Sequence, residues 1–509
     1  MSSKKSTTSV PNEEEDIPQG NVEIIEDVDP NNQENPDQMG EPNEEEDEAE
    51  GILNRTENDE FYCVTSFLKP DQSLIIASGC QNDCVYLNLI NSNNTSEESS
   101  KKTFILKAHR DSVTCLSFSP DGRFLASGGL DGQVFVWNTE NGDLISCPEH
   151  SIGSGCIRPP TVGENEFLSE AKIGTTHPIN WVSWHPSPKL PLLAAGDSIG
   201  RVRLWNATNG ECKVLFWTND LSPNVVEPRF LDTPDAESAE SGKSESDKPA
   251  KNQEEETEEE MEMEELFSIA GGWTPNGSEL WSCGAEGVKV FKPKADSAKT
   301  ISMNYENSQR KSADGSFIPY HSSTIRSAAI SKDGAFIVSG DEEGSLRIVS
   351  NSSPLRVLTD LSISSPKDND DSVMKSFECT SFSSDGRFVA AASLDGSTYI
   401  WEKGANWQLR VALKHGAGVT SLRFNPAVPH LLVTGAVDGS VKVWDIRNGQ
   451  CLETLREPII DMSADYEELP MVAVTQLDAL HLQIGIMVVV ASSQDGTLQM
   501  FTIPEVQSA

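Results

Sequence analysis

The chain contains 509 residues, of which 80 are aspartate or glutamate and 39 are lysine or arginine, giving a formal net charge of -41 at pH 7. A charge this negative argues against direct binding to DNA, RNA or anionic membranes, because all of these are polyanions. No segment has the length and apolar character of a membrane span or a signal peptide, so we expect a cytoplasmic protein, with the nucleus as a second compartment.

The first 60 residues carry 20 acidic and 3 basic side chains and few apolar ones. Such a segment cannot bury enough apolar surface to offset the conformational entropy that folding removes. The sequence therefore predicts a disordered acidic arm over residues 1–60. Residues 220–266, with 17 acidic and 4 basic side chains, predict a second disordered acidic segment, inserted within the folded part of the chain.

A phrase recurs from residue 61 onward: an apolar strand, a Pro-Asp-Gly-like turn, a strand of small residues, Asp-Gly, and a strand ending in an aromatic residue. The clearest copies cover residues 108–138 and 414–445; weaker copies cover 61–83, 179–206, 267–292, 325–350, 377–402 and 471–501. The alternation of apolar and polar residues indicates β-strands, and the repeat indicates four-stranded blades arranged in a ring. We predict an all-β WD40 β-propeller of eight blades over residues 61–503, although the degraded first and last copies leave seven blades open.

Two of the repeats contain a matching set of polar residues. The sets are His109, Ser127, Asp131 and Trp137, and His415, Thr434, Asp438 and Trp444. In both, the carboxylate follows the hydroxyl by four residues and the indole follows the carboxylate by six. A Ser-His-Asp catalytic triad is the alternative interpretation, but an active site is not expected to recur in two blades. We expect hydrogen-bonded networks that satisfy polar groups inside the blades.

The sequence contains no phosphate-binding glycine loop, no His-Glu-x-x-His helix and no paired-cysteine ligand set. The ten cysteines lie mostly in apolar strand-like runs and are expected to be reduced. We therefore expect a monomer that is not an enzyme and that binds neither a metal nor a cofactor.

The acidic residues of the repeats are predicted to gather at one end of the ring. In a propeller blade the innermost strand runs downward from the top face, so residues that flank its first apolar residue lie on that face. The same holds for the turn before the third strand and for long connections between blades, such as residues 456–470. The predicted binding residues for a basic peptide are Glu60, Tyr62, Asp341, Glu342, Glu343, Glu378, Asp465, Glu467 and Glu468.

Beyond the general WD-repeat pattern, the chain resembles the angio-associated migratory cell protein family and its fungal counterparts, which act in ribosome assembly. The resemblance rests on the acidic arm, on INWVSWHP leading into LLAAGDSIGRVRLWNATNGEC (179–212), and on the blade ending SLRIVSNSSP (345–354). The glutamate-rich residues 220–266 depart from the family. The resemblance implies a chaperone that captures the basic N-terminal segment of a newly made large-subunit ribosomal protein and reaches the pre-ribosome indirectly, through that client.

Two other functions are compatible with the sequence. An acidic WD-repeat histone chaperone would also need an acidic face, and it would be expected in the nucleus. A generic WD-repeat scaffold or ubiquitin-ligase adaptor would not need such a charge, and it would usually carry a recruiting domain. The charge favours a basic polypeptide client, ribosomal or histone, over nucleic acid or membrane.

Overall fold

A computed structural model describes most of the repeat region and two short segments before it. The described residues are 21–26, 51–56, 59–91, 100–146, 177–198, 200–207, 212–217, 268–284, 287–295, 301–307, 310–311, 317–318, 321–352, 355–363, 375–458, 472–482 and 486–504. Residues 220–266 and the rest of the arm lie outside them, as do Asp465, Glu467 and Glu468.

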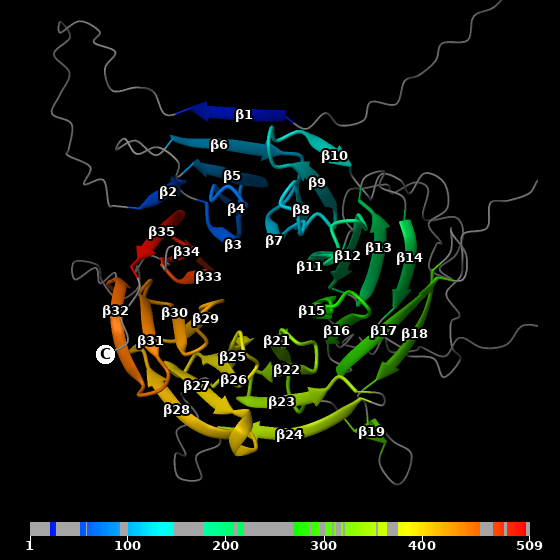
Figure 1. Ribbon diagram of the computed structural model, residues 1–509, viewed down its shortest axis with the longest axis vertical. Helices are drawn as coiled ribbons and strands as arrows, with labels where there is room; N and C mark the ends of the chain where they lie inside the picture. Colours follow the sequence, from blue (N-terminus) through cyan, green and yellow to red (C-terminus); the bar gives the residue numbers. More distant parts are fainter. Residues whose placement is uncertain are drawn as a thin grey trace, which may run out of the picture.

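The strands form eight blades around a common axis, as the repeats predicted, and this settles the choice between seven and eight (Figure 1). Blade one consists of β3 (Phe61–Leu68), β4 (Leu74–Cys80), β5 (Cys84–Asn91) and β6 (Ser100–Lys107). Blade two consists of β7 (Val113–Phe118), β8 (Phe124–Gly129), β9 (Val134–Asn138) and β10 (Leu144–Ser146). Blade three consists of β11 (Ile179–Trp184), β12 (Leu192–Asp197), β13 (Arg201–Asn206) and β14 (Cys212–Trp217).

The next four blades have the same antiparallel order. Blade four consists of β15 (Ser268–Trp273), β16 (Leu280–Gly284), β17 (Gly287–Ala295) and β18 (Ile301–Asn307). Blade five consists of β21 (Ile325–Ile330), β22 (Phe336–Asp341), β23 (Ser345–Ser350) and β24 (Arg356–Ser362). Blade six consists of β25 (Phe377–Phe382), β26 (Phe388–Ser393), β27 (Ser397–Glu402) and β28 (Gln408–Lys414). Blade seven consists of β29 (Val419–Phe424), β30 (Leu431–Ala436), β31 (Val441–Asp445) and β32 (Gln450–Arg456).

Two short elements lie outside this pattern. The two-stranded ribbon of β19 (Arg310–Lys311) and β20 (Phe317–Ile318) lies between blades four and five in the sequence. A single 3₁₀ turn, η2 (Lys403–Ala405), joins β27 to β28. The described part of the chain contains no α-helix.

Blade eight takes its outer strand from the start of the chain. It consists of β33 (Val474–His481), β34 (Met487–Ser493), β35 (Thr497–Ile503) and β2 (Ile52–Arg55). β2 pairs antiparallel with β35, and Leu53, only 7% exposed, packs in the cluster that joins blades eight and one. The last and first parts of the propeller are thus held in one sheet.

The prediction of disorder over residues 1–60 is therefore wrong for two segments. β2 belongs to the propeller, and β1 (Asn21–Glu26) pairs with β6 as a fifth strand of blade one. The high charge of the arm as a whole concealed two short runs, NVEIIE and ILNR, that can pair with a sheet edge. The copy at 471–501 contains only three strands, so its fourth strand had to come from elsewhere in the chain.

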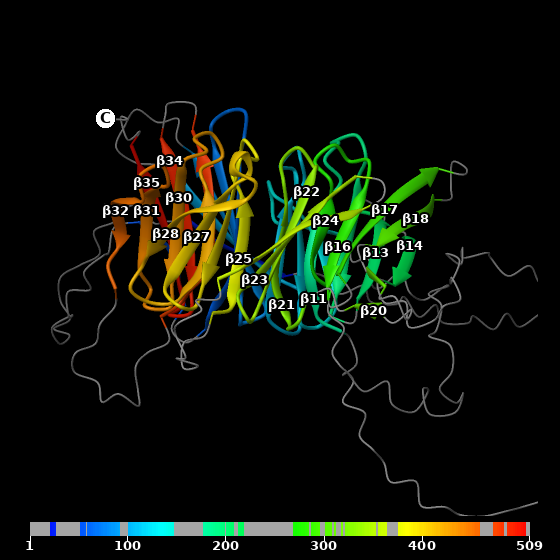
Figure 2. The ribbon, with the colours of Figure 1, turned by 90° about the horizontal axis from the view of Figure 1, so that it is seen from below.

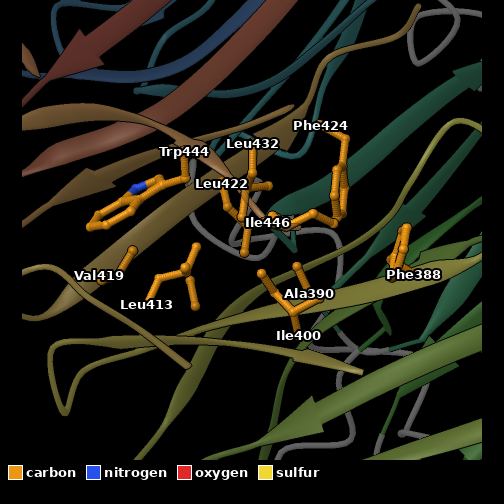
Figure 3. Close-up of a cluster of buried hydrophobic side chains, with 11 residues drawn as sticks. Phe388, Ala390, Ile400, Leu413, Val419, Leu422, Phe424, Leu432, Trp444 and Ile446 are labelled. Atoms are coloured by element: carbon orange, nitrogen blue, oxygen red, sulfur yellow. The ribbon is translucent and has the colours of Figure 1, made fainter. Parts of the chain in front are cut away.

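The hydrophobic core is divided among the junctions between blades. Eight clusters of buried residues occur in the described part, and each draws on two neighbouring blades. Figure 3 shows the cluster of blades six and seven, where Phe388 and Ile400 of one blade pack toward Leu422 and Trp444 of the next. Because a blade cannot cover its own two faces, each depends on its neighbours for stability.

We expect Leu53→Ala to lower the free energy of unfolding by about 2 to 3 kcal/mol, because it leaves a cavity in the junction that closes the ring. Leu358→Ala is the matched control, since Leu358 lies in the outer strand β24 and is 47% exposed. It should cost less than about 0.5 kcal/mol. Chemical denaturation of the full chain measures both, and equal losses would mean that β2 does not close the ring.

Candidate functional site

The inner strands of all eight blades begin at the same end of the ring, which we call the top face. Each inner strand contacts the next in ring order, and β33 meets β3 to complete the circle. In the side view the strands of the different blades run along a common direction (Figure 2). The turns between second and third strands, and the connections from one blade to the next, belong to this same end by topology.

The second residue of the inner strand joins neighbouring blades in half of the ring. In blades two, three, seven and eight, its side chain donates a hydrogen bond to the carbonyl of the first inner-strand residue of the next blade. The bonds are Thr114 Oγ1 to Ile179 O (2.8 Å), Asn180 Nδ2 to Ser268 O (2.9 Å), Thr420 Oγ1 to Val474 O (2.5 Å) and Thr475 Oγ1 to Phe61 O (2.5 Å). We call these bonds the inter-blade locks.

Three other blades have larger or charged side chains at this position. Tyr62 occupies it in blade one, Arg326 in blade five and Glu378 in blade six. The residue before each is fully or almost fully buried, which aligns the three positions with the locks. None of the three forms a bond of the lock type among the described residues, so these side chains do not serve as inter-blade locks.

Blades five and six bring three of the predicted acidic residues together. Glu342 and Glu343 lie in the turn after β22, and Glu378 lies at the start of β25. Arg326 reaches between the blades, with Nη1 3.6 Å from Glu342 Oε1 and Nε 3.6 Å from Glu378 Oε2. Their predicted solvent-facing position at the top of the ring implies that Glu342 and Glu378 are unpaired in the free protein, and the shared arginine shows that this prediction is wrong. Spacing in the sequence did not reveal that an arginine 52 residues before Glu378 faces it.

Asp341 does not belong to this surface. It is 0% exposed, and its carboxylate accepts hydrogen bonds from His321 Nδ1 (2.8 Å) and from the backbone of Ser345 (2.7 Å). His321 Nε2 lies 2.9 Å from Ser339 Oγ. Blade five thus contains a third His-hydroxyl-carboxylate set, which the sequence analysis missed because Asp341 follows Ser339 by two residues rather than four.

The two predicted polar sets differ from each other. In blade two, His109 Nε2 lies 2.8 Å from Ser127 Oγ, Trp137 Nε1 donates to the same oxygen at 2.9 Å, and His109 Nδ1 is 3.1 Å from Asp131. These four side chains form one continuous network inside the blade.

Blade seven contains only part of this network. Trp444 Nε1 donates to Thr434 Oγ1 at 2.8 Å, but Ser440 stands between His415 and Asp438. His415 Nε2 has no hydrogen-bond partner among the described residues. Burial, together with the positive charge of Lys442, lowers the pKa of His415 to about 4.

A second acidic group lies on blades one and two. Glu60 and Tyr62 flank Phe61. Asp111 lies close enough to raise the pKa values of both Tyr62 and Asp83. Burial raises the pKa of Tyr62, and Glu60 raises it further. Burial also raises the pKa of Asp83, with added contributions from Asp111 and Asp131. In the described part of the chain, no lysine or arginine forms a salt bridge with Glu60, Asp83 or Asp111.

Asp83 and Asp111 were not among the residues predicted from the sequence. Asp83 stands where the second repeat has the glycine of its Asp-Gly turn, and its φ of 64° is in the left-handed region that aspartate tolerates. Aligning the two turns would have revealed it. Beside Asp83 is a cavity of about 410 Å³, whose lining includes Tyr86, Lys107 and His109.

The predicted site residues therefore form two groups rather than one. Glu342, Glu343 and Glu378 lie on blades five and six, whereas Glu60 and Tyr62 lie on blade one, across the ring (Figure 1). Within the described ranges, no group of three or more histidine, cysteine or acidic side chains is arranged to hold a metal ion. No helix in those ranges has the length and apolarity to cross a membrane.

The family described as "WD domain, G-beta repeat" matches residues 100–138, 315–350, 371–402 and 407–445. The chain thus carries WD repeats in these four segments and folds as an eight-bladed β-propeller. It resembles angio-associated migratory cell protein, which confirms the resemblance noted in the sequence. The Homo sapiens protein is 23% identical over 384 residues, covering 70% of this chain and 73% of the relative; the Canis lupus familiaris protein is 22% identical over the same length.

Solved structures of Sqt1 share the fold. Sqt1 from Chaetomium thermophilum superposes with a TM-score of 0.56 at 18% identity, covering 87% of this chain and 96% of that one. Saccharomyces cerevisiae Sqt1 gives 0.57 at 14% identity, covering 89% and 99%. Chaetomium thermophilum Sqt1 bound to the N-terminus of the ribosomal protein L10 gives 0.54 at 19% identity, also covering 89% and 99%.

Removing the shared hydroxyl should be more costly in blade two than in blade seven. Ser127→Ala leaves Trp137 Nε1 and His109 Nε2 without a partner, so we expect a loss of about 2 to 3 kcal/mol in the free energy of unfolding. Thr434→Val leaves only Trp444 unpaired and should cost about 1 kcal/mol. Denaturant titration compares them, and a larger loss for Thr434→Val would contradict the difference between the two networks.

His415 should make the fold sensitive to mild acid. Because its pKa is about 4 in the folded chain and ordinarily 6.5, the unfolded chain takes up the proton first as pH falls. Its contribution to stability is complete above pH 6.5 and is lost as pH falls toward 4, by about 3 kcal/mol. Denaturation at several pH values should show a flatter dependence for His415→Gln than for the unmodified chain. Parallel curves would contradict this assignment.

Proposed function

We propose that this chain is a chaperone that binds the basic segment of a newly made large-subunit ribosomal protein on its top face and thereby supports ribosome assembly. The observation that carries the proposal is the placement of acidic and aromatic side chains at top-face positions that lock the blades together elsewhere. The likeness to Sqt1, one structure of which is bound to the N-terminus of the ribosomal protein L10, supports the choice of client.

The two acidic groups suit an extended basic segment better than a compact ligand. They lie on opposite sides of the ring, so one ligand that contacts both must cross the top face. Glu60, Asp83 and Asp111 offer carboxylates without a lysine or arginine partner in the described part of the chain. Glu342, Glu343 and Glu378 offer further acidic contacts on the other side.

Such binding would act by competition and without catalysis. A segment rich in arginine and lysine binds RNA nonspecifically, because its charges replace the counterions around the phosphates. The acidic top face would occupy the same side chains until ribosomal RNA displaces it. We place this activity in the cytoplasm, where ribosomal proteins are made, with the nucleus as a second compartment.

Titration calorimetry with an arginine- and lysine-rich peptide from the N-terminus of ribosomal protein L10 tests the proposal. Affinity should fall steeply as salt rises, because exposed charges are screened over about 8 Å at physiological ionic strength. Glu60→Gln and Glu378→Gln should each weaken binding by about fivefold. Glu140→Gln is the matched control, since Glu140 is exposed in the turn between β9 and β10, at the other end of the strands.

The ribosomal peptide should also bind more tightly than a histone-tail peptide of equal charge. Equal affinity for the two would contradict a dedicated ribosomal client. Binding that does not depend on salt, or that falls equally with Glu140→Gln, would contradict the electrostatic role of the top face.

A further inference from the structure

Arg326 is a cation that lies between two glutamates of the top face, and the fold does not need it as a lock. It occupies the lock position of blade five, but the next residue makes the junction bond instead: Ser327 Oγ donates to Phe377 O at 2.9 Å. The side chain of Arg326 is 47% exposed. Arg326 therefore acts at the surface and does not join blades five and six.

The contacts of Arg326 are loose. Both of its glutamate partners are 3.6 Å away, beyond hydrogen-bond length, and Glu342 is itself 42% exposed. By contrast, two arginines of blade six hold their glutamate tightly: Arg387 and Arg410 lie 2.7 Å and 2.6 Å from Glu402. Glu378 is 20% exposed and also accepts a hydrogen bond from Ser376 Oγ at 2.5 Å, which fixes its carboxylate without the arginine.

We propose that Arg326 is a resident cation, which occupies the Glu342 and Glu378 pair in the free protein and is displaced by an arginine or lysine side chain of the bound segment. This inference rests on the proposed function and adds a residue that regulates it. An exposed, loosely held ion pair contributes little to stability, so a second cation can replace the first at small cost. A guanidinium from the ligand can then bind the carboxylates at hydrogen-bond distance.

The resident cation would make the top face selective. An isolated cation gains little at blades five and six, because it must replace a charge that is already present. A basic segment that also contacts Glu60, Asp83 and Asp111 across the ring gains enough elsewhere to displace Arg326. The arginine thus discriminates against short or sparsely charged ligands while leaving the attraction at blades one and two unchanged.

Substitution of Arg326 tests this inference on the full chain with the L10 peptide. We expect Arg326→Gln to increase affinity by about fivefold, because the ligand no longer competes with a resident charge. Arg326→Lys keeps the charge and should change affinity little. The matched control is Arg387→Gln, which removes the same charge from an exposed, glutamate-paired arginine in the turn at the opposite end of blade six. Because charges that far apart are screened, this control should leave affinity unchanged.

The glutamates provide the second half of the test. In a chain that carries Glu342→Gln and Glu378→Gln, adding Arg326→Gln should give a much smaller gain, since no carboxylate pair remains to be released. The inference is overturned if Arg326→Gln lowers affinity or leaves it unchanged, if Arg387→Gln gives an equal gain, or if the gain persists without the glutamates. Thermal melting of each variant verifies folding. Failure of the unmodified chain to bind the peptide would instead overturn the proposed function.

Discussion

Each blade has two apolar faces that it cannot cover alone, and the whole structure depends on this constraint. Every buried cluster of the described chain is shared by two neighbouring blades, so a gap at any junction would expose the faces on both sides. β2 removes the gap between blades eight and one by completing a sheet whose other strands come from the opposite end of the chain. The same junction is reinforced by Asp478, which accepts hydrogen bonds from the backbone and the hydroxyl of Ser66 at 2.8 Å and 2.6 Å.

Closure of the ring also explains how the chain tolerates its charge. The interior contributes almost no unpaired charge, because its buried carboxylates, such as Asp341 and Asp131, accept several hydrogen bonds each. The excess acid lies on the surface of the ring and in residues outside the described ranges. Since the locks use small polar side chains in only half of the blades, the equivalent positions elsewhere can hold tyrosine, arginine or glutamate without weakening a junction.

The repeats predicted the blades well because their signals are local. An Asp-Gly turn between two alternating strands specifies a hairpin through backbone conformation alone, and eight such phrases specify eight blades. β2 could not be found this way, because a four-residue strand has no periodicity and its partner lies more than 400 residues away. Composition averaged over 60 residues hid Leu53 among acidic neighbours.

The site was predicted less completely, for a related reason. Topology placed Glu60, Glu342 and Glu378 at one end of the ring, but it did not show which side chains of the next blade reach them. Asp341 and Glu342 are adjacent and chemically similar, yet the first is buried against His321 and the second is exposed beside Arg326. The partner that each carboxylate meets decides whether it is buried in a hydrogen-bonded network or exposed on the surface. The sequence alone does not specify these partners.

The charge that the top face presents is what remains after the internal pairs have formed. Asp197 is paired with Arg201, Asp495 with Arg456, and Asp131 with His109, so these carboxylates add little attraction at short range. Glu342 and Glu378 share one arginine. Glu60, Asp83 and Asp111 have no lysine or arginine partner among the described residues, and the raised pKa of Asp83 shows how burial and carboxylates close to one another disfavour its charge. Under the proposed function, a cation that binds there would relieve this repulsion, and blades one and two would be the side of the ring where a basic segment gains most on first contact.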